Sequence, residues 1–142
     1  MNIKHIKQKL FFVSAIGVSI SLLFFVVTCF WIGYEVKTQC QDAKREYPTS
    51  PTASRGQADC VEALLMLLND ENISFRARNS AIWALGQLGD RRALPILQGY
   101  YTGIIQNKES FDKTISQYEL KKAINLTSGG LNITAFFWKN IF

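Results

Sequence analysis

Few residues of this chain could carry covalent or acid–base chemistry. The 142-residue sequence has one histidine, His5, and three cysteines, Cys29, Cys40 and Cys60. A zinc site usually takes four cysteine or histidine ligands, and His5 lies in a basic leader far from two of the cysteines, so no metal site is predicted. The sequence also lacks a glycine-rich phosphate-binding loop and a nucleophile elbow. We therefore expect no catalytic residue and no cofactor.

The chemistry that remains is a disulfide between Cys40 and Cys60. Cys29 lies within a long apolar run, whereas the other two cysteines lie beyond it, 20 residues apart. In an oxidising compartment, closing a loop of this size stabilises a small domain by about 3 kcal/mol. The alternative is a pair of unbonded thiols, one of them on the buried face of a helix. We predict the disulfide and leave this alternative open.

The apolar run that holds Cys29 predicts a transmembrane helix. Residues 10–34, LFFVSAIGVSISLLFFVVTCFWIGY, contain no charge. At about 1.5 Å per residue they can cross a hydrocarbon core of about 30 Å. Trp31 and Tyr34 close the far end, where aromatic rings favour the headgroup layer. The chain should therefore contact the lipid bilayer through residues 10–34, after a basic leader at residues 1–9.

A cleaved signal peptide is the alternative to this anchor. Its apolar part usually spans about 7–15 residues and ends in a small-residue cleavage site. The run here is longer and ends in large aromatic residues, which favours an uncleaved, single-pass helix.

The orientation of the helix follows from its flanks. The basic residues near its two ends are equal in number: Lys4, Lys7 and Lys9 before it, and Lys37, Lys44 and Arg45 after it. The first group contains no acid and includes the amino terminus. We therefore predict a cytoplasmic N-terminus, with the rest of the chain outside the cytoplasm.

The net charge of +5 does not indicate a nucleic-acid partner. Three of the basic residues lie in the leader, and the others are scattered among acids along the chain. A protein that neutralises phosphates gathers its cations on one face. We predict no binding to DNA or RNA.

Beyond residue 34 the sequence predicts an all-α fold. Residues 35–57 should extend the membrane helix to residue 46 and then form a linker rich in Pro, Ser and Thr. Apolar residues at helical spacing predict helices at 58–68, 73–88 and 111–126, the second capped by Asn72. Gly89 should end the second helix and Asp90 should cap another, which Pro95 should kink.

The C-terminal tail, residues 128–142, is apolar and aromatic but too short to span a membrane. Three roles are open for it: it could cap the helical core, lie in the membrane interface, or contact a partner.

Residues 77–97, ARNSAIWALGQLGDRRALPIL, resemble a HEAT repeat of the short phycobilisome-lyase-like kind. The family pattern has an arginine where Arg78 stands, Ala-Leu-Gly-x-Leu-Gly-Asp at 84–90 and Ala-Leu-Pro-x-Leu at 93–97. Residues 61–70 look like the first helix of the preceding unit, and the insertion at 72–76 departs from the pattern.

This resemblance implies a short HEAT-like α-solenoid of about two helix pairs at residues 58–127. The residues that match the motif and should hold its structure are Arg78, Gly86, Gly89, Asp90 and Pro95. Repeats stack because one helix pair cannot bury its apolar face alone. The two ends must then be covered, and the candidates are the helix at 35–46, pinned by the disulfide, and the tail.

The second predicted helix presents a candidate binding face opposite its alanines. The residues on this face are Arg76, Asn79, Trp83 and Gln87. In stacked helical repeats such a face is the usual contact surface, and a tryptophan beside an arginine is typical of a binding hot spot. The alternative is that residues 35–56 fold over Trp83 and bury it.

We therefore predict a membrane-tethered adaptor or scaffold, not an enzyme, that binds an unidentified protein or peptide. One alternative is a structural subunit of a membrane complex. The other is an enzyme of the kind that attaches bilins to cysteines, which the resemblance leaves open and against which the missing acid–base residues count.

Overall fold

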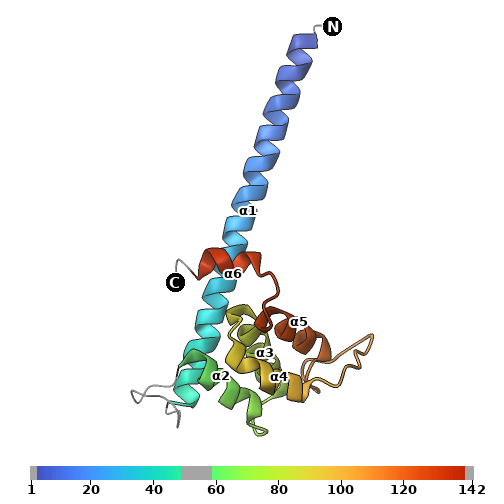
Figure 1. Cartoon of the computed structure of the whole chain (residues 1–142). Coiled ribbons are helices and arrows are strands. Elements are labelled where there is room, and N and C mark those ends of the chain that lie inside the picture. The colour runs from blue at the N-terminus through green and yellow to red at the C-terminus, as the bar shows by residue number, and fades with distance from the viewer. Residues whose placement is uncertain (1–2, 49–58, 140–142) are drawn as a thin grey trace.

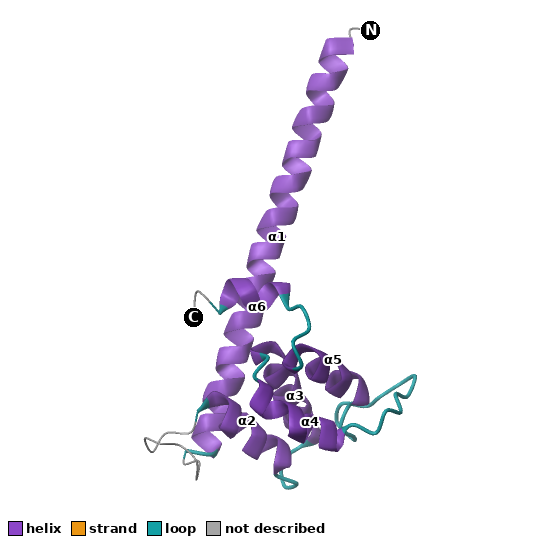
Figure 2. Cartoon of the chain, viewed as in Figure 1, coloured by secondary structure: helices purple, strands orange, loops and turns teal. Residues whose placement is uncertain are grey.

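The computed structural model describes residues 3–48 and 59–139, with the side chains of residues 3–10 left out, and in this part of the chain every regular element is a helix (Figures 1 and 2). The elements are α1 (Ile3–Glu46), α2 (Cys60–Asn69), α3 (Phe75–Leu88), the short 3-10 helix η1 (Arg91–Ala93), α4 (Leu94–Tyr100), α5 (Gln117–Thr127) and α6 (Ile133–Trp138). The all-α prediction is confirmed. Residues 49–58, which hold most of the predicted linker, and residues 140–142 of the tail lie outside the described residues.

The longest element, α1, is one unbroken helix of 44 residues. Its N-terminal half projects away from the other helices, and its C-terminal half lies along them (Figure 1). Residues 11–24 are exposed throughout. From Phe25 onward the other helices cover one side of α1. Cys29, Gly33 and Val36, which share one helical face, are buried there. The domain therefore begins to contact α1 inside the apolar run.

Side-chain caps decide where the shorter helices begin. Asp59 accepts hydrogen bonds from the amides of Val61 (2.7 Å) and Glu62 (3.4 Å), so α2 begins at Cys60 rather than at residue 58. The predicted cap at Asn72 is wrong. The backbone amide of Asn72 donates to the Asp70 carboxylate before it. Ser74 caps α3 instead, by accepting a hydrogen bond from the amide of Ala77.

The start predicted for the helix at residue 111 is also wrong. Residues 111–114 form a turn, and α5 begins only at Gln117. Ser116 caps it through the amide of Glu119 at 3.1 Å. The hydroxyl of Ser116 is itself bonded to Glu109, so the chain before α5 is held in an irregular path.

The junction between α3 and α4 matches the motif in part. Gly89 ends α3 in the left-handed conformation with φ of 62°, and Asp90 caps η1 through the amide of Arg92. The kink predicted at Pro95 is absent. Pro95 lies in the first turn of α4, where its missing amide has no helical acceptor to lose.

Small side chains allow α3 and α5 to pack closely. Ala81 and Ala84 of α3 are completely buried, and Ala123 of α5 is nearly so. Gly86 lies directly against α5, because a Cβ placed on it would come within 2.8 Å of the Cα of Ala123. The motif residue Gly86 therefore lies at the crossing of these two helices.

The C-terminal part of α1 covers the open side of α2. Ala43 is buried in the main core, and Cys40 and Cys60 lie at disulfide distance, with 5.2 Å between their Cα atoms. Below the disulfide, the hydroxyl of Tyr47 donates to Asp70 at 2.6 Å. Burial and the neighbouring Asp70 carboxylate raise the pKa of Tyr47 to about 12. The predicted cap at one end of the solenoid is thus found.

The described part of the tail, residues 128–139, lies at the junction of α1 and α3. Its helix, α6, returns to α1 and crosses it (Figure 1). Ala135 and Trp138 of α6 form a second small core with Val36, against which Trp83 and Leu88 of α3 also pack.

We expect Gly86→Ala to lower the free energy of unfolding by about 1–3 kcal/mol, since the new methyl group would overlap the backbone of α5. Gly99 is the matched control, because a Cβ there meets nothing within 4 Å. Gly99→Ala should raise stability by about 0.5–1 kcal/mol through helix propensity. Urea unfolding of the full chain in detergent micelles measures both, and equal effects of the two substitutions would contradict the close packing.

Candidate functional site

A cleft of about 240 Å³ lies where α1, α3 and α5 meet. Two of its walls come from α1 and α3, and the third comes from α5 and the chain before it. The lining residues are Glu35, Gln39, Asn79, Ser80, Trp83, Phe111 and Glu119. We call this cleft the Trp83 groove.

Trp83 is half-buried and links the two cores. Part of its side chain packs against the main core, and part packs beside Val36 and Trp138 in the second core. The remaining surface lines the groove. Residues 35–46 therefore lie beside Trp83 without covering it completely. Trp83 is neither fully exposed on a binding face nor fully buried by this segment.

Two carboxylates give the groove its electrostatic character. Glu35 comes from α1 and accepts a hydrogen bond from the Gln39 amide at 3.1 Å. Glu119 comes from α5, is buried, and pairs with Lys122 at 2.6 Å. Lys122 also lies 4.6 Å from the centre of the Tyr118 ring. The groove thus combines part of the Trp83 indole with two acids, one of which already pairs with a lysine.

Asn79 lines the groove but is not on an exposed face, so this part of the predicted surface is corrected. Its side chain is completely buried. The amide nitrogen donates to the carbonyls of Phe111 (3.0 Å) and Thr114 (2.8 Å), and the amide oxygen accepts from the backbone nitrogen of Ser116 (2.8 Å). Asn79 therefore holds the irregular chain before α5 against α3.

The other two residues of the predicted face lie on either side of the groove. Arg76 is exposed and makes a two-point ion pair with Asp112, at 2.7 and 3.2 Å. The guanidinium lowers the pKa of Asp112. Gln87, farther along α3, accepts a hydrogen bond from Asn132 at 3.0 Å. The structure therefore brings only Trp83 and Asn79 together in one site.

Several lining residues of the groove were missed from the sequence. Glu35 and Gln39 are one helical turn apart on α1, and Glu119 is the single acid of the amphipathic helix α5. The one available signal was the i, i+4 pair of Glu35 and Gln39 just after the apolar run. Nothing in the local pattern shows that α1 packs beside α3.

Arg78, one of the motif residues, makes its contacts inside the fold. Its side chain is buried and donates to the carbonyl of Leu68 at the end of α2, at 2.8 Å. The guanidinium also lies 5.7 Å from the centre of the Phe75 ring and 5.8 Å from that of Tyr100. Arg78 therefore joins the end of α2 to α3 and α4.

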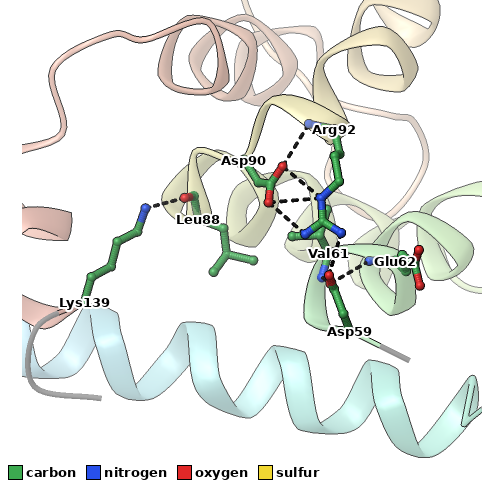
Figure 3. A network of polar contacts seen from close by, with 7 residues as sticks. All are labelled: Asp59, Val61, Glu62, Leu88, Asp90, Arg92 and Lys139. Carbon is green, nitrogen blue, oxygen red and sulfur yellow. Dashed lines mark hydrogen bonds and ion pairs between the residues drawn. The ribbon is translucent and has the colours of Figure 1, made fainter. Parts of the chain in front are cut away.

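A network at the edge of the solenoid joins the first turn of α2 to η1 (Figure 3). Arg92 pairs with Asp59 at 2.5 Å and with Asp90 at 2.8 Å. The hydrogen bond from Arg92 is the main cause of the lowered pKa of Asp90. At Asp59 burial opposes ionisation, but the bonds from Arg92 and two backbone amides outweigh it and lower that pKa as well. The motif residue Asp90 therefore has two contacts with Arg92. Its carboxylate caps η1 at the Arg92 amide and also pairs with the Arg92 guanidinium.

Figure 3 also shows Lys139 directed at the C-terminal end of α3, where its ammonium group donates to the carbonyl of Leu88. This bond fixes the end of α6 to the solenoid. Within residues 3–48 and 59–139, no group of three or more His, Cys, Asp or Glu side chains is arranged to hold a metal ion.

A model of the family described as HEAT repeats matches residues 52–103, the part of the chain that holds α2, α3, η1 and α4. No curated protein and no solved structure gives a significant match to the chain.

We expect Asn79→Ala to destabilise the fold by about 2–3 kcal/mol, because three backbone groups would lose their partner. Asn72→Ala is the control, since Asn72 is exposed and bonds only within its turn. Its cost should stay below about 1 kcal/mol. Chemical unfolding of the full chain in detergent micelles gives both values. A small effect at Asn79 would show that the chain before α5 is held by other contacts.

Proposed function

Since residues 52–103 of this chain belong to the HEAT-repeat family, we propose that the chain is a membrane-tethered protein-interaction module whose Trp83 groove binds a basic segment of a partner protein. HEAT repeats in general mediate contacts between proteins and serve as non-enzymatic scaffolds. The observation that carries the proposal is the groove itself, which offers an indole face and two carboxylates beside the repeat.

Tethering is supported by the form of α1. From Phe11 it is long and apolar enough to cross a membrane, and its most apolar stretch is not buried by the rest of the chain. The same helix continues to the disulfide at Cys40. Disulfides persist in oxidising compartments, which supports placing the helical domain outside the cytoplasm and the N-terminus inside it.

The chemistry of the groove favours a cationic side chain. A lysine or arginine over the Trp83 ring gains a cation–π contact. The carboxylate of Glu35 adds charge complementarity, which contributes to specificity and to the rate of association. Glu119 already pairs with Lys122. The natural occupant is therefore a partner segment with an exposed lysine or arginine.

The place of the groove supports a partner in the same membrane. Glu35 directly follows Tyr34, the last residue of the apolar run. A basic segment that follows the membrane helix of another protein would lie at the same level. Confinement of both proteins to one membrane raises their effective concentration, so a small groove is sufficient for binding.

A crosslinking experiment in cells tests the groove. A photoreactive amino acid is placed at Gln39 of the full chain, and the adducts are identified. Glu35→Lys should reduce the partner adduct about tenfold, because it reverses one of the two charges. Ser80→Trp should do the same by filling the groove.

The controls are Glu71→Lys and Gln98→Trp, at exposed positions outside the groove. Adducts that survive both groove substitutions would refute the proposed site.

Thiol labelling tests the orientation and the disulfide together. In intact cells a membrane-impermeant maleimide should leave Cys40 unlabelled until a reductant is added, and Cys60→Ser should make Cys40 react without it. The same substitution should lower stability by about 3 kcal/mol, since the 20-residue closure is lost. If Cys40 of this variant reacted only after permeabilisation, the domain would be cytoplasmic and the orientation wrong.

A further inference from the structure

The outward face of α6 is apolar although the helix is short and lies on the surface. Its inward face carries Ala135 and Trp138, which are buried in the second core. On the other side Ile133 is 55% exposed, Phe136 is 71% exposed and Phe137 is 45% exposed. Leu131, just before the helix, is 84% exposed. Four large apolar side chains thus lie together on a segment that ends the described chain.

This apolar face is continuous with the surface of α1 that we propose to lie in the membrane. The rings of Phe137 and Phe25 meet edge to face, with 5.4 Å between their centres. Phe25 belongs to the apolar run, and Leu23 and Phe24 next to it are 66% and 73% exposed. Lipid around α1 at this level would therefore also meet the outer face of α6.

The level of α6 matches the boundary of a bilayer. From residue 10 to Phe25 the helix rises about 22 Å, most of a hydrocarbon core of about 30 Å. The exposed aromatic residues Phe30, Trp31 and Tyr34 lie just beyond this point. Because α6 crosses α1 in the direction shown in Figures 1 and 2, it would lie along the bilayer plane when α1 crosses the bilayer.

Polar contacts hold α6 in this rotation. Asn132 caps the helix through the amide of Ala135 at 3.0 Å and donates to Gln87 of α3, also at 3.0 Å. At the other end, Lys139 donates to the carbonyl of Leu88. Both ends of α6 are thus fixed to α3, so its apolar residues cannot turn toward the protein.

We propose that α6 is an interfacial docking helix that inserts Ile133, Phe136 and Phe137 into the boundary between the headgroups and acyl chains of the bilayer. Amphipathic helices of this kind bury their apolar face about 5–10 Å into that boundary. The inference rests on the proposed crossing of the membrane by α1 and is independent of the Trp83 groove. It gives the chain a second membrane contact, which sets the height and rotation of the solenoid above the lipid.

Depth-dependent quenching tests this contact. The full chain with Cys29→Ser, its disulfide intact, is reconstituted in vesicles of phosphatidylcholine and phosphatidylglycerol. A fluorescent NBD label is attached at F136C, at F24C or at Q98C. We expect lipids brominated near the headgroup to quench the label at 136 at least fivefold more than the label at 98. Lipids brominated deep in the acyl chains should quench the label at 24 most.

The three labels separate the possible failures. Quenching at 24 without quenching at 136 would overturn the role of α6 and leave the membrane crossing of α1 in place. No quenching at either position would refute the crossing itself. A label at 136 that emits as if shielded from water, yet is not quenched by lipid, would show that protein covers the face, and this outcome also overturns the proposal.

A substitution provides an independent measurement. Phe136→Asp together with Phe137→Asp should lower headgroup-level quenching of a label at L131C at least fivefold, while the label at F24C keeps its quenching. The control is Ile104→Asp, at an exposed position in the loop between α4 and α5, which should leave the label at 131 unchanged. Unchanged quenching at 131 in the double variant would contradict the proposal.

Discussion

The packing of the C-terminal half of α1 on α2 and α3 is the contact on which the rest of the structure depends. A solenoid of about two helix pairs leaves apolar faces open at its ends. Here α1 continues without a break and closes one of them, with Ala43 in the core and Cys40 at disulfide distance from Cys60. The helix that we propose as the tether is therefore also a part of the fold.

The groove and the position of the tail both follow from this contact. Glu35 and Gln39 reach the groove because α1 lies beside α3, so one wall of the candidate site belongs to the helix that we propose to cross the membrane. The second core forms at the same junction, where Val36 meets Trp138. The fold, the candidate site and the proposed membrane boundary thus meet within about three turns of α1.

The local features of the fold were predictable from the sequence, and the long-range ones were not. The uncharged run, the left-handed Gly89, the Asp90 cap and the helical solenoid all follow from residue type and spacing. The start of α5 was missed because a distant side chain decides it: Asn79 bonds the backbone that would otherwise continue a helix backward. The sequence placed the start of the helix that contains Pro95 too early. Because α4 begins only at Leu94, Pro95 lies in its first turn and causes no kink.

In the candidate site too, the features set by local spacing were predictable from the sequence, and those set by long-range packing were not. Trp83 was predicted from its helical spacing, which places it opposite the alanines of the same helix and beside Arg76, a pairing typical of binding surfaces. Asn79 satisfied the same pattern, and only the tertiary structure reveals that it is buried. Glu35 and Glu119 come from elements far apart in the sequence, and no local periodicity relates them.

The unbroken course of α1 has a mechanical consequence. It contains no proline, and its hydrogen-bonded backbone runs from one side of the proposed bilayer into the core of the solenoid. Transmembrane helices tilt when the thickness of the surrounding bilayer changes. Because α1 is continuous, a tilt of its membrane part would also move the part of α1 that carries Glu35. The geometry of the groove would therefore respond to the lipid composition around the protein.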